Sequence, residues 1–226
     1  MDAMVGVYNS ELDRFNAAHA HADRKARGDA VDGFIDTDPG RISWTRALKA
    51  DLAKDKEFAF DEKCLTPSLY RPFTRQWLYY SRTFNEMVYQ MPRIFPMGEV
   101  ADNRVICITG LGEAAGFSCL QSKEAPNFHF IAGSQCFPRY LYDEDATDDE
   151  AQGNLLAGNT GNGQRRDAIT DAGLAHFQAA YPGESITKDD LFHYVYGLLH
   201  SEYYRERYAD NLSKQLPRIP ASLPEG

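Results

Sequence analysis

RVICIT, residues 104–109, is the stretch of this sequence with the clearest structural preference, and Gly110 follows it directly. β-branched and other apolar side chains in such a short run favour a buried strand, which the glycine then ends. Weaker stretches of similar composition lie around it, with Gly and Pro between them, at 58–60, 77–80, 116–120, 128–132 and 137–142. This spacing predicts a mixed or antiparallel sheet over about residues 58–142.

Helical patterns flank this region on both sides. Apolar residues at helical spacing predict that residues 1–30 form a helix, and Ser43 is expected to cap a short helix that carries Trp44, Leu48 and Leu52. Toward the other end, helices are expected at 167–180, after a Thr187 cap, and from Ser201 to Leu212. The sequence therefore predicts an α+β fold with a central sheet and helices at both the N- and C-terminal ends.

The glycine-rich stretch 28–40 reads as a loop or linker. We therefore expect two parts, an N-terminal helix with its linker in residues 1–40 and a larger domain in residues 41–226. The C-terminal helical part of that domain is expected at about 165–216.

Charge is unevenly distributed along the chain. The net charge of −9 argues against nucleic-acid binding, because phosphate contacts need a positive surface. Residues 70–140, however, contain seven bases and five acids, a balance of 7 − 5 = +2, and the next ten residues hold six acids and no base. A locally basic face is therefore compatible with the acidic total.

No motif for catalysis or metal binding stands out. The cysteines are widely spaced, and Cys107 and Cys119 lie in apolar runs where they are expected to be small buried residues. The glycines at 110 and 112 are better explained by a bend between strands than by a dinucleotide loop. No membrane-spanning run and no secretory signal is present, so a cytoplasmic protein with neither metal nor cofactor is expected, and not an enzyme by itself.

Basic and aromatic residues alternate in residues 70–77 and again in 89–93. Arginine and glutamine can read base edges, so these segments could contact DNA. The alternative is that Phe73, Trp77 and Tyr89 belong to the core, with the arginines at its rim. Composition alone favours this second interpretation.

The same segments resemble the C-terminal specificity region of type ISP restriction-modification enzymes. The resemblance covers roughly residues 40–220 in the family's order, and it is carried by the blocks SWTR (43–46), SLYRPF (68–73), QWLY (76–79), YQMPRIF (89–95), GSQCFP (133–138), DAITD (167–171), SIT (185–187), YVYGLLHS (194–201) and YRERY (204–208). Several long blocks in register are more specific than any single motif. Residues 1–40 would then resemble the connector on the methyltransferase side.

The resemblance implies a target-recognition domain that binds double-stranded DNA. It would position DNA for an adenine methyltransferase, a translocase and a nuclease that lie upstream, in the same or a companion polypeptide. The candidate DNA contacts are Arg71, Arg75, Arg82, Gln90, Arg93, Lys123, Asn127, Gln135 and Arg139. Two alternatives stay open, namely a protein-interaction module that docks on such a methyltransferase without binding DNA alone, and a stand-alone enzyme with an enclosed polar pocket.

Overall fold

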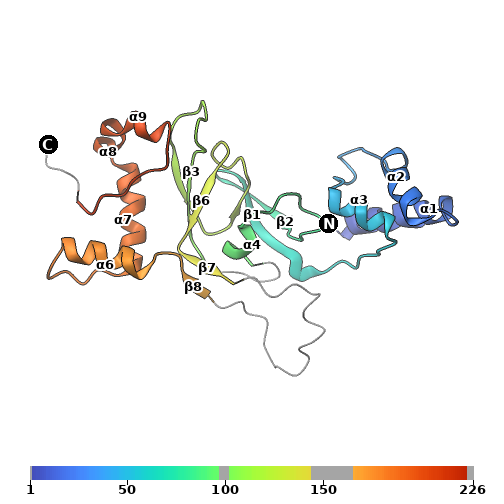
Figure 1. Cartoon of the computed structure of the whole chain (residues 1–226), viewed down its shortest axis with the longest axis horizontal. Helices are drawn as coiled ribbons and strands as arrows, with labels where there is room; N and C mark the ends of the chain where they lie inside the picture. The colour runs from blue at the N-terminus through green and yellow to red at the C-terminus, as the bar shows by residue number, and fades with distance from the viewer. Residues whose placement is uncertain (1, 97–101, 144–164, 223–226) are drawn as a thin grey trace, which may run out of the picture. The chain divides into compact units, whose positions relative to one another are not determined.

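The computed structural model describes residues 2–96, 102–143 and 165–222. It confirms the α+β fold, with helices at the N- and C-terminal ends of the chain and most of the strands between them in the sequence (Figure 1). The chain forms two compact units. Of the described residues, 2–66 and 77–89 belong to the first unit, and 67–76, 90–96, 102–143 and 165–222 belong to the second.

The first unit is a helical cluster around a small core. Its helices are α1 (Asp2–Ala18), α2 (Arg24–Phe34) and α3 (Arg46–Ala53), followed by the short 3-10 helix η1 (Glu62–Cys64). Tyr8, Phe15, Leu48 and Leu52 are completely buried in the core between them. The expected single helix over residues 1–30 is wrong, because Asp23 caps a second helix by accepting a hydrogen bond from Ala26 N. As a consequence, α2 occupies part of the expected 28–40 linker.

Two further local expectations for the first unit are wrong. Thr45, not Ser43, caps α3, because its hydroxyl accepts from Leu48 N and also donates to the carbonyl of Thr83. The expected strand at 58–60 does not form. Instead, the Asn9 side chain bonds both the N–H and the carbonyl of Phe58, which satisfies the backbone without a strand partner.

The second unit is built on a three-stranded antiparallel sheet, in the order β4–β3–β6. The central strand β3 (Val105–Ile108) lies between β4 (Cys119–Ser122) and β6 (Gln135–Pro138) and is buried throughout. The predicted strand at 104–109 is thus confirmed. Cys107 and Cys119 are buried, as expected, and Cys107 lies opposite Cys136 with the two thiols free.

The C-terminal helices cover one face of this sheet. Helix α6 (Asp171–Ala180) precedes α7 (Lys188–His200), α8 (Glu202–Arg207) and α9 (Ala209–Leu212). Ile106 and Ile108 of β3 share a core cluster with Phe192 and Leu199 of α7. The Thr187 cap is confirmed, and it forms a reciprocal capping box with Asp190 that fixes the start of α7.

The remaining strands belong to two smaller sheets. Strand β1 (Leu65–Arg71) lies between β2 (Thr74–Tyr79) and the short strand β5 (Ala125–Pro126), to which it is parallel. Strand β7 (Tyr140–Tyr142) pairs with β8 (Arg165–Asp167), and the short helix α4 (Met91–Ile94) packs on β7. The expected strand at 128–132 is wrong. Asn127 accepts a turn hydrogen bond from Phe130 N, and Ala132 has a positive φ of 57°, so this segment is a loop.

Candidate nucleic-acid interface

The tip of the β1–β2 hairpin carries an exposed phenylalanine. Strand β1 ends at Arg71, β2 begins at Thr74, and Pro72 and Phe73 form the turn between them. The Phe73 side chain is 97% exposed, and its backbone has a φ of 71°. Trp77 and Tyr89 are also exposed. The expectation that these three aromatic residues form part of the core is therefore wrong.

Two arginines lie on either side of the turn, one on each strand. Arg71 donates from Nη1 to the carbonyl of His129 at 2.5 Å, and its guanidinium lies 4.9 Å from the centre of the Tyr70 ring. Arg75 donates from Nε to Oε2 of Glu124 at 3.0 Å. These bonds orient the two guanidiniums. Both residues are exposed, so the guanidiniums also remain accessible to a ligand.

The β5 strand and the loop after it hold the other wall of this surface. Ser68 of β1 donates to the carbonyl of Ala125 at 2.7 Å, and Asn127 N donates to the carbonyl of Leu69 at 2.8 Å. These bonds attach the loop to the hairpin. The Asn127 side chain accepts from His129 N, which shapes the loop and leaves Phe128 61% exposed.

The resulting surface, which we call the hairpin-tip surface, consists of residues 70–76 and 123–129. Its bases are Arg71, Arg75 and Lys123, and its one acid is Glu124, a balance of 3 − 1 = +2 in a chain of net charge −9. Another acid, Glu113 of the segment between β3 and β4, lies outside this surface beside Gly133, since a methyl group on Gly133 would lie 2.6 Å from its Oε1. The hairpin-tip surface thus has a net positive charge, although the chain as a whole is negatively charged.

Four of the nine predicted contact residues meet on this surface, namely Arg71, Arg75, Lys123 and Asn127.

Gln90 and Arg93 form a pair in another place, at α4, where Arg93 Nη1 donates to Gln90 Oε1 at 3.1 Å. Gln135 lies in β6, half-buried opposite Ile108. Arg82 is exposed in the first unit, in the segment after β2.

Arg139 occupies a different environment. It is buried between β6 and β7, where Nε donates to Asp189 at 2.7 Å and Nη1 donates to Asp167. Burial disfavours its charge, but the bonds to Asp189 and Asp167 outweigh this and raise its pKa. Its Nε and Nη1 donate to these carboxylates and the residue is buried, so its position fits a scaffold residue.

Sequence reasoning did not select Phe73, Phe128, His129 or Glu124 as site residues. The alternation of basic and aromatic residues in 70–77 was the available signal for Phe73. For the loop residues, the sequence offered no signal, because the parallel pairing of β5 with β1 joins segments 57 residues apart.

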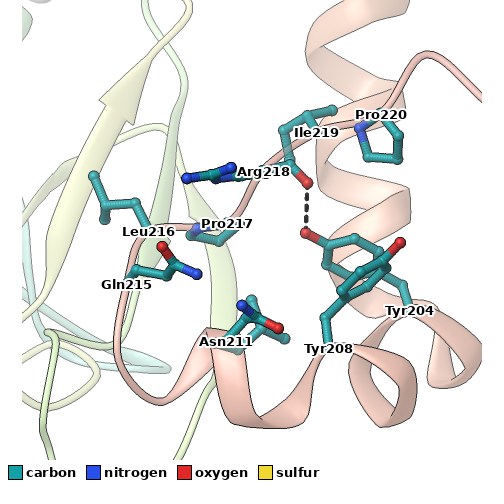
Figure 2. A pocket seen from close by; sticks show the side chains of 10 residues that line it. Tyr204, Tyr208, Asn211, Gln215, Leu216, Pro217, Arg218, Ile219 and Pro220 are labelled. Carbon is teal, nitrogen blue, oxygen red and sulfur yellow. Dashed lines mark hydrogen bonds between the residues drawn. The ribbon is translucent and has the colours of Figure 1, made fainter.

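One cavity in the second unit has a volume of about 420 Å³. It lies between α8–α9 and the segment 215–220, as Figure 2 shows, and Asn211 and Gln215 line it. The Tyr204 hydroxyl at its wall donates to the carbonyl of Arg218 at 2.7 Å. Its lining holds neither a carboxylate nor a histidine, so it lacks the residues that most often act as general acid and base.

Residues 2–96, 102–143 and 165–222 bring no three His, Cys, Asp or Glu side chains together in a metal-binding cluster. Within those same ranges, none of the helices has the length and apolar character needed to cross a membrane.

Comparison with known proteins gives a consistent result. The model of the family described as the Type ISP C-terminal specificity domain matches residues 1–223. No curated protein matches the chain.

Three solved structures have a similar fold over almost the whole chain. A cryo-EM structure of a DrdV–DNA complex is 35% identical with a TM-score of 0.76, over 97% of this chain and 19% of that one. A nuclease-deletion mutant of the Type ISP restriction-modification enzyme LlaGI, in complex with a DNA substrate mimic, is 33% identical with a TM-score of 0.70, over 96% and 17%. The ATP-dependent Type ISP restriction-modification enzyme LlaBIII bound to DNA is 26% identical with a TM-score of 0.69, over 95% and 13%. The chain thus spans less than a fifth of the length of these proteins.

Proposed function

The chain belongs to the family of Type ISP C-terminal specificity domains, and from this we propose that it recognises a specific sequence in double-stranded DNA. The three similar structures are all complexes with DNA or a DNA mimic, which supports the proposal. The observation that carries it within this chain is the hairpin-tip surface, where three bases are exposed beside aromatic side chains and two of them, Arg71 and Arg75, are oriented by a neighbour.

Recognition divides into positioning and reading. Arg71, Arg75 and Lys123 are suited to phosphate contacts, which place the duplex without reading its sequence. Gln90 and Arg93 are the best candidates for base reading, because glutamine pairs bidentately with adenine and arginine with guanine. Arg93 already fixes the Gln90 amide at 3.1 Å, which reduces the freedom lost on binding.

Arg82, Asn127 and Gln135 are proposed as further contacts of the DNA path. Arg139 we assign to the scaffold, since both carboxylate partners already occupy its guanidinium. The chain itself is proposed to recognise DNA and to catalyse nothing. The methyltransferase, the ATP-driven translocase and the nuclease implied by the resemblance would be its partners, in the same or a companion polypeptide.

The net charge of −9 limits how strongly the chain can bind DNA by itself. Phosphate affinity grows with the number of contacts, and three bases on the hairpin-tip surface supply only a modest share of it. We therefore expect the chain to bind DNA at low salt and to depend on its partner domains at physiological salt.

The test is fluorescence anisotropy of the chain with a pool of randomised duplexes at about 50 mM salt, where phosphate contacts are strong, followed by selection and sequencing. We expect enrichment of one short site and an affinity that falls steeply with salt. Arg71→Ala should weaken binding to all sequences and reduce the salt slope by about one, the value for one lost phosphate contact. Arg207→Ala, on α8, removes the same charge elsewhere in the second unit and serves as the control.

Two results would contradict the proposal. Absence of binding at low salt would favour the docking module, which a pull-down with the methyltransferase would then test. Binding that enriches no sequence would leave a general DNA-binding surface and remove the specificity claim.

A further inference from the structure

Phe73 is exposed to a degree that the fold does not require. Its side chain is 97% exposed at the apex of the hairpin, so it contributes nothing to the core. A large apolar side chain that stays in water gains none of the stabilisation that burial would give it. Trp77 and Phe128, two other exposed aromatic residues, are less exposed, at 64% and 61%.

The backbone at Phe73 is also unusual for this residue type. A turn with proline first and a positive φ second is typical of type II, in which glycine or asparagine normally occupies the second position. Phe73 has a φ of 71°, where its Cβ is disfavoured. The turn therefore holds a strained residue whose side chain makes no compensating core contact, and this combination is characteristic of functional positions.

The surroundings of Phe73 identify the kind of partner. Arg71 and Arg75 lie on the two strands beside it, fixed by His129 and Glu124 respectively. An apolar apex between two fixed cations suits the DNA duplex. The cations can contact phosphates while the ring enters the stack of bases, as apolar wedges do in proteins that kink DNA.

We propose that Phe73 is a wedge that inserts between neighbouring base pairs of double-stranded DNA and partly unstacks them. This inference rests on the proposed function of DNA recognition. It adds that the chain reads the ease with which a base step deforms, besides the base edges. Flexible steps, in which a pyrimidine precedes a purine, would be preferred at that position because they unstack most easily.

The test uses 2-aminopurine, a base analogue whose fluorescence rises when it loses stacking. It is placed at successive positions of the short duplex that the chain selects, and the full chain is added at low salt. We expect an increase at one step of the duplex. Phe73→Gly and Phe73→Ala should abolish the increase and weaken binding on the order of tenfold, the scale of a contact between an aromatic side chain and a base. Phe73→Leu should retain most of it, since leucine also serves as a wedge.

Tyr181→Ala removes an exposed aromatic side chain at the end of α6 and should change neither signal. Phe73→Gly keeps the test valid if the alanine variant folds poorly, because glycine accepts the positive φ.

The results of this experiment distinguish insertion of Phe73 between base pairs from DNA recognition itself. Tight binding by the unmodified chain without a fluorescence increase at any position would overturn the wedge and leave DNA recognition standing. An increase that survives Phe73→Gly would show that another group unstacks the bases. Failure of the unmodified chain to bind any duplex would overturn both proposals, and it would leave an apolar surface of a protein partner as the occupant of Phe73.

Discussion

Arg139 donates from Nε to Asp189 at 2.7 Å and thereby joins the end of β6 to the first turn of α7. The same guanidinium bonds Asp167 of β8, whose carboxylate also accepts from Lys188 Nζ at 3.0 Å. One buried cation thus connects a sheet strand, the small β7–β8 sheet and the helix that covers the main sheet. This network fixes how the C-terminal helices meet the strands that precede them.

Replacing Arg139 by Met should therefore destabilise the second unit. We expect a loss of about 1–3 kcal/mol in the free energy of unfolding, less than for a fully buried pair because both carboxylates stay partly hydrated. Urea denaturation followed by circular dichroism measures it. Arg41→Met breaks an ion pair in which both side chains are exposed, and it should cost under about 1 kcal/mol. Equal losses in the two variants would contradict the structural role of Arg139.

The network also predicts how stability depends on pH. Hydrogen bonds from Arg139 and Lys188 lower the pKa of Asp167 below its ordinary value of 3.8. A carboxyl whose pKa is lower in the folded state contributes stability above its unfolded pKa and loses it as the pH falls through the folded value. Asp167→Asn should thus destabilise the chain at pH 7, and the gap to the unmodified chain should narrow below pH of about 4. Asp13→Asn, an exposed carboxylate outside the network, is the control, and a gap that does not change with pH would argue against this role.

The turn at Phe73 gives a prediction of the opposite sign. Phe73→Gly removes a side chain that buries nothing and relieves a positive φ of 71°. The free energy of unfolding should stay equal or rise by up to about 1 kcal/mol, since glycine avoids the Cβ clash but is more flexible when unfolded. Thermal and urea denaturation test this. A clear loss of stability would mean that the Phe73 ring supports the fold, which would weaken the case for a functional role.

Local signals explain which elements could be predicted from the sequence. The β-branched run of β3 and the Thr187 cap of α7 both encode their structure within a few residues, and both predictions are confirmed. Ser43 and Thr45 offer the same capping hydroxyl two residues apart. Thr45 is the residue that caps α3, and its hydroxyl also donates to the carbonyl of Thr83, 38 residues away in the sequence. Contacts of that range leave no local pattern.

In the candidate site, too, some residues could be predicted from local signals, whereas contacts between distant residues could not. The alternation of arginines and aromatic residues in 70–77 pointed to Arg71 and Arg75, because charge and type can be read directly. The interpretation of Phe73 as core failed because composition favours burial of large apolar residues, whereas a two-residue turn leaves its tip no element to pack against. The partnership of Arg75 with Glu124 depends on the pairing of β1 with β5, which is set by the fold as a whole.

That partnership leads to a prediction about affinity. Glu124 holds Arg75 Nε at 3.0 Å and is the one acid of the hairpin-tip surface. Phosphate would have to compete with this carboxylate for the guanidinium and would also be repelled by it. Glu124→Gln keeps the size of the side chain, removes the charge and should tighten binding to duplex DNA by roughly 2- to 10-fold at low salt, an advantage that shrinks as salt rises.

Arg75→Ala should weaken binding, and the double variant should resemble Arg75→Ala alone if Glu124 acts through that arginine. Glu184→Gln, after α6, removes an exposed acid outside the hairpin-tip surface and controls for the change in net charge. Anisotropy titrations at several salt concentrations give both the affinity and the salt slope. Weaker binding by Glu124→Gln would reverse the interpretation. It would mean that the carboxylate aims Arg75 at the duplex, and that the orientation it provides outweighs the repulsion it causes.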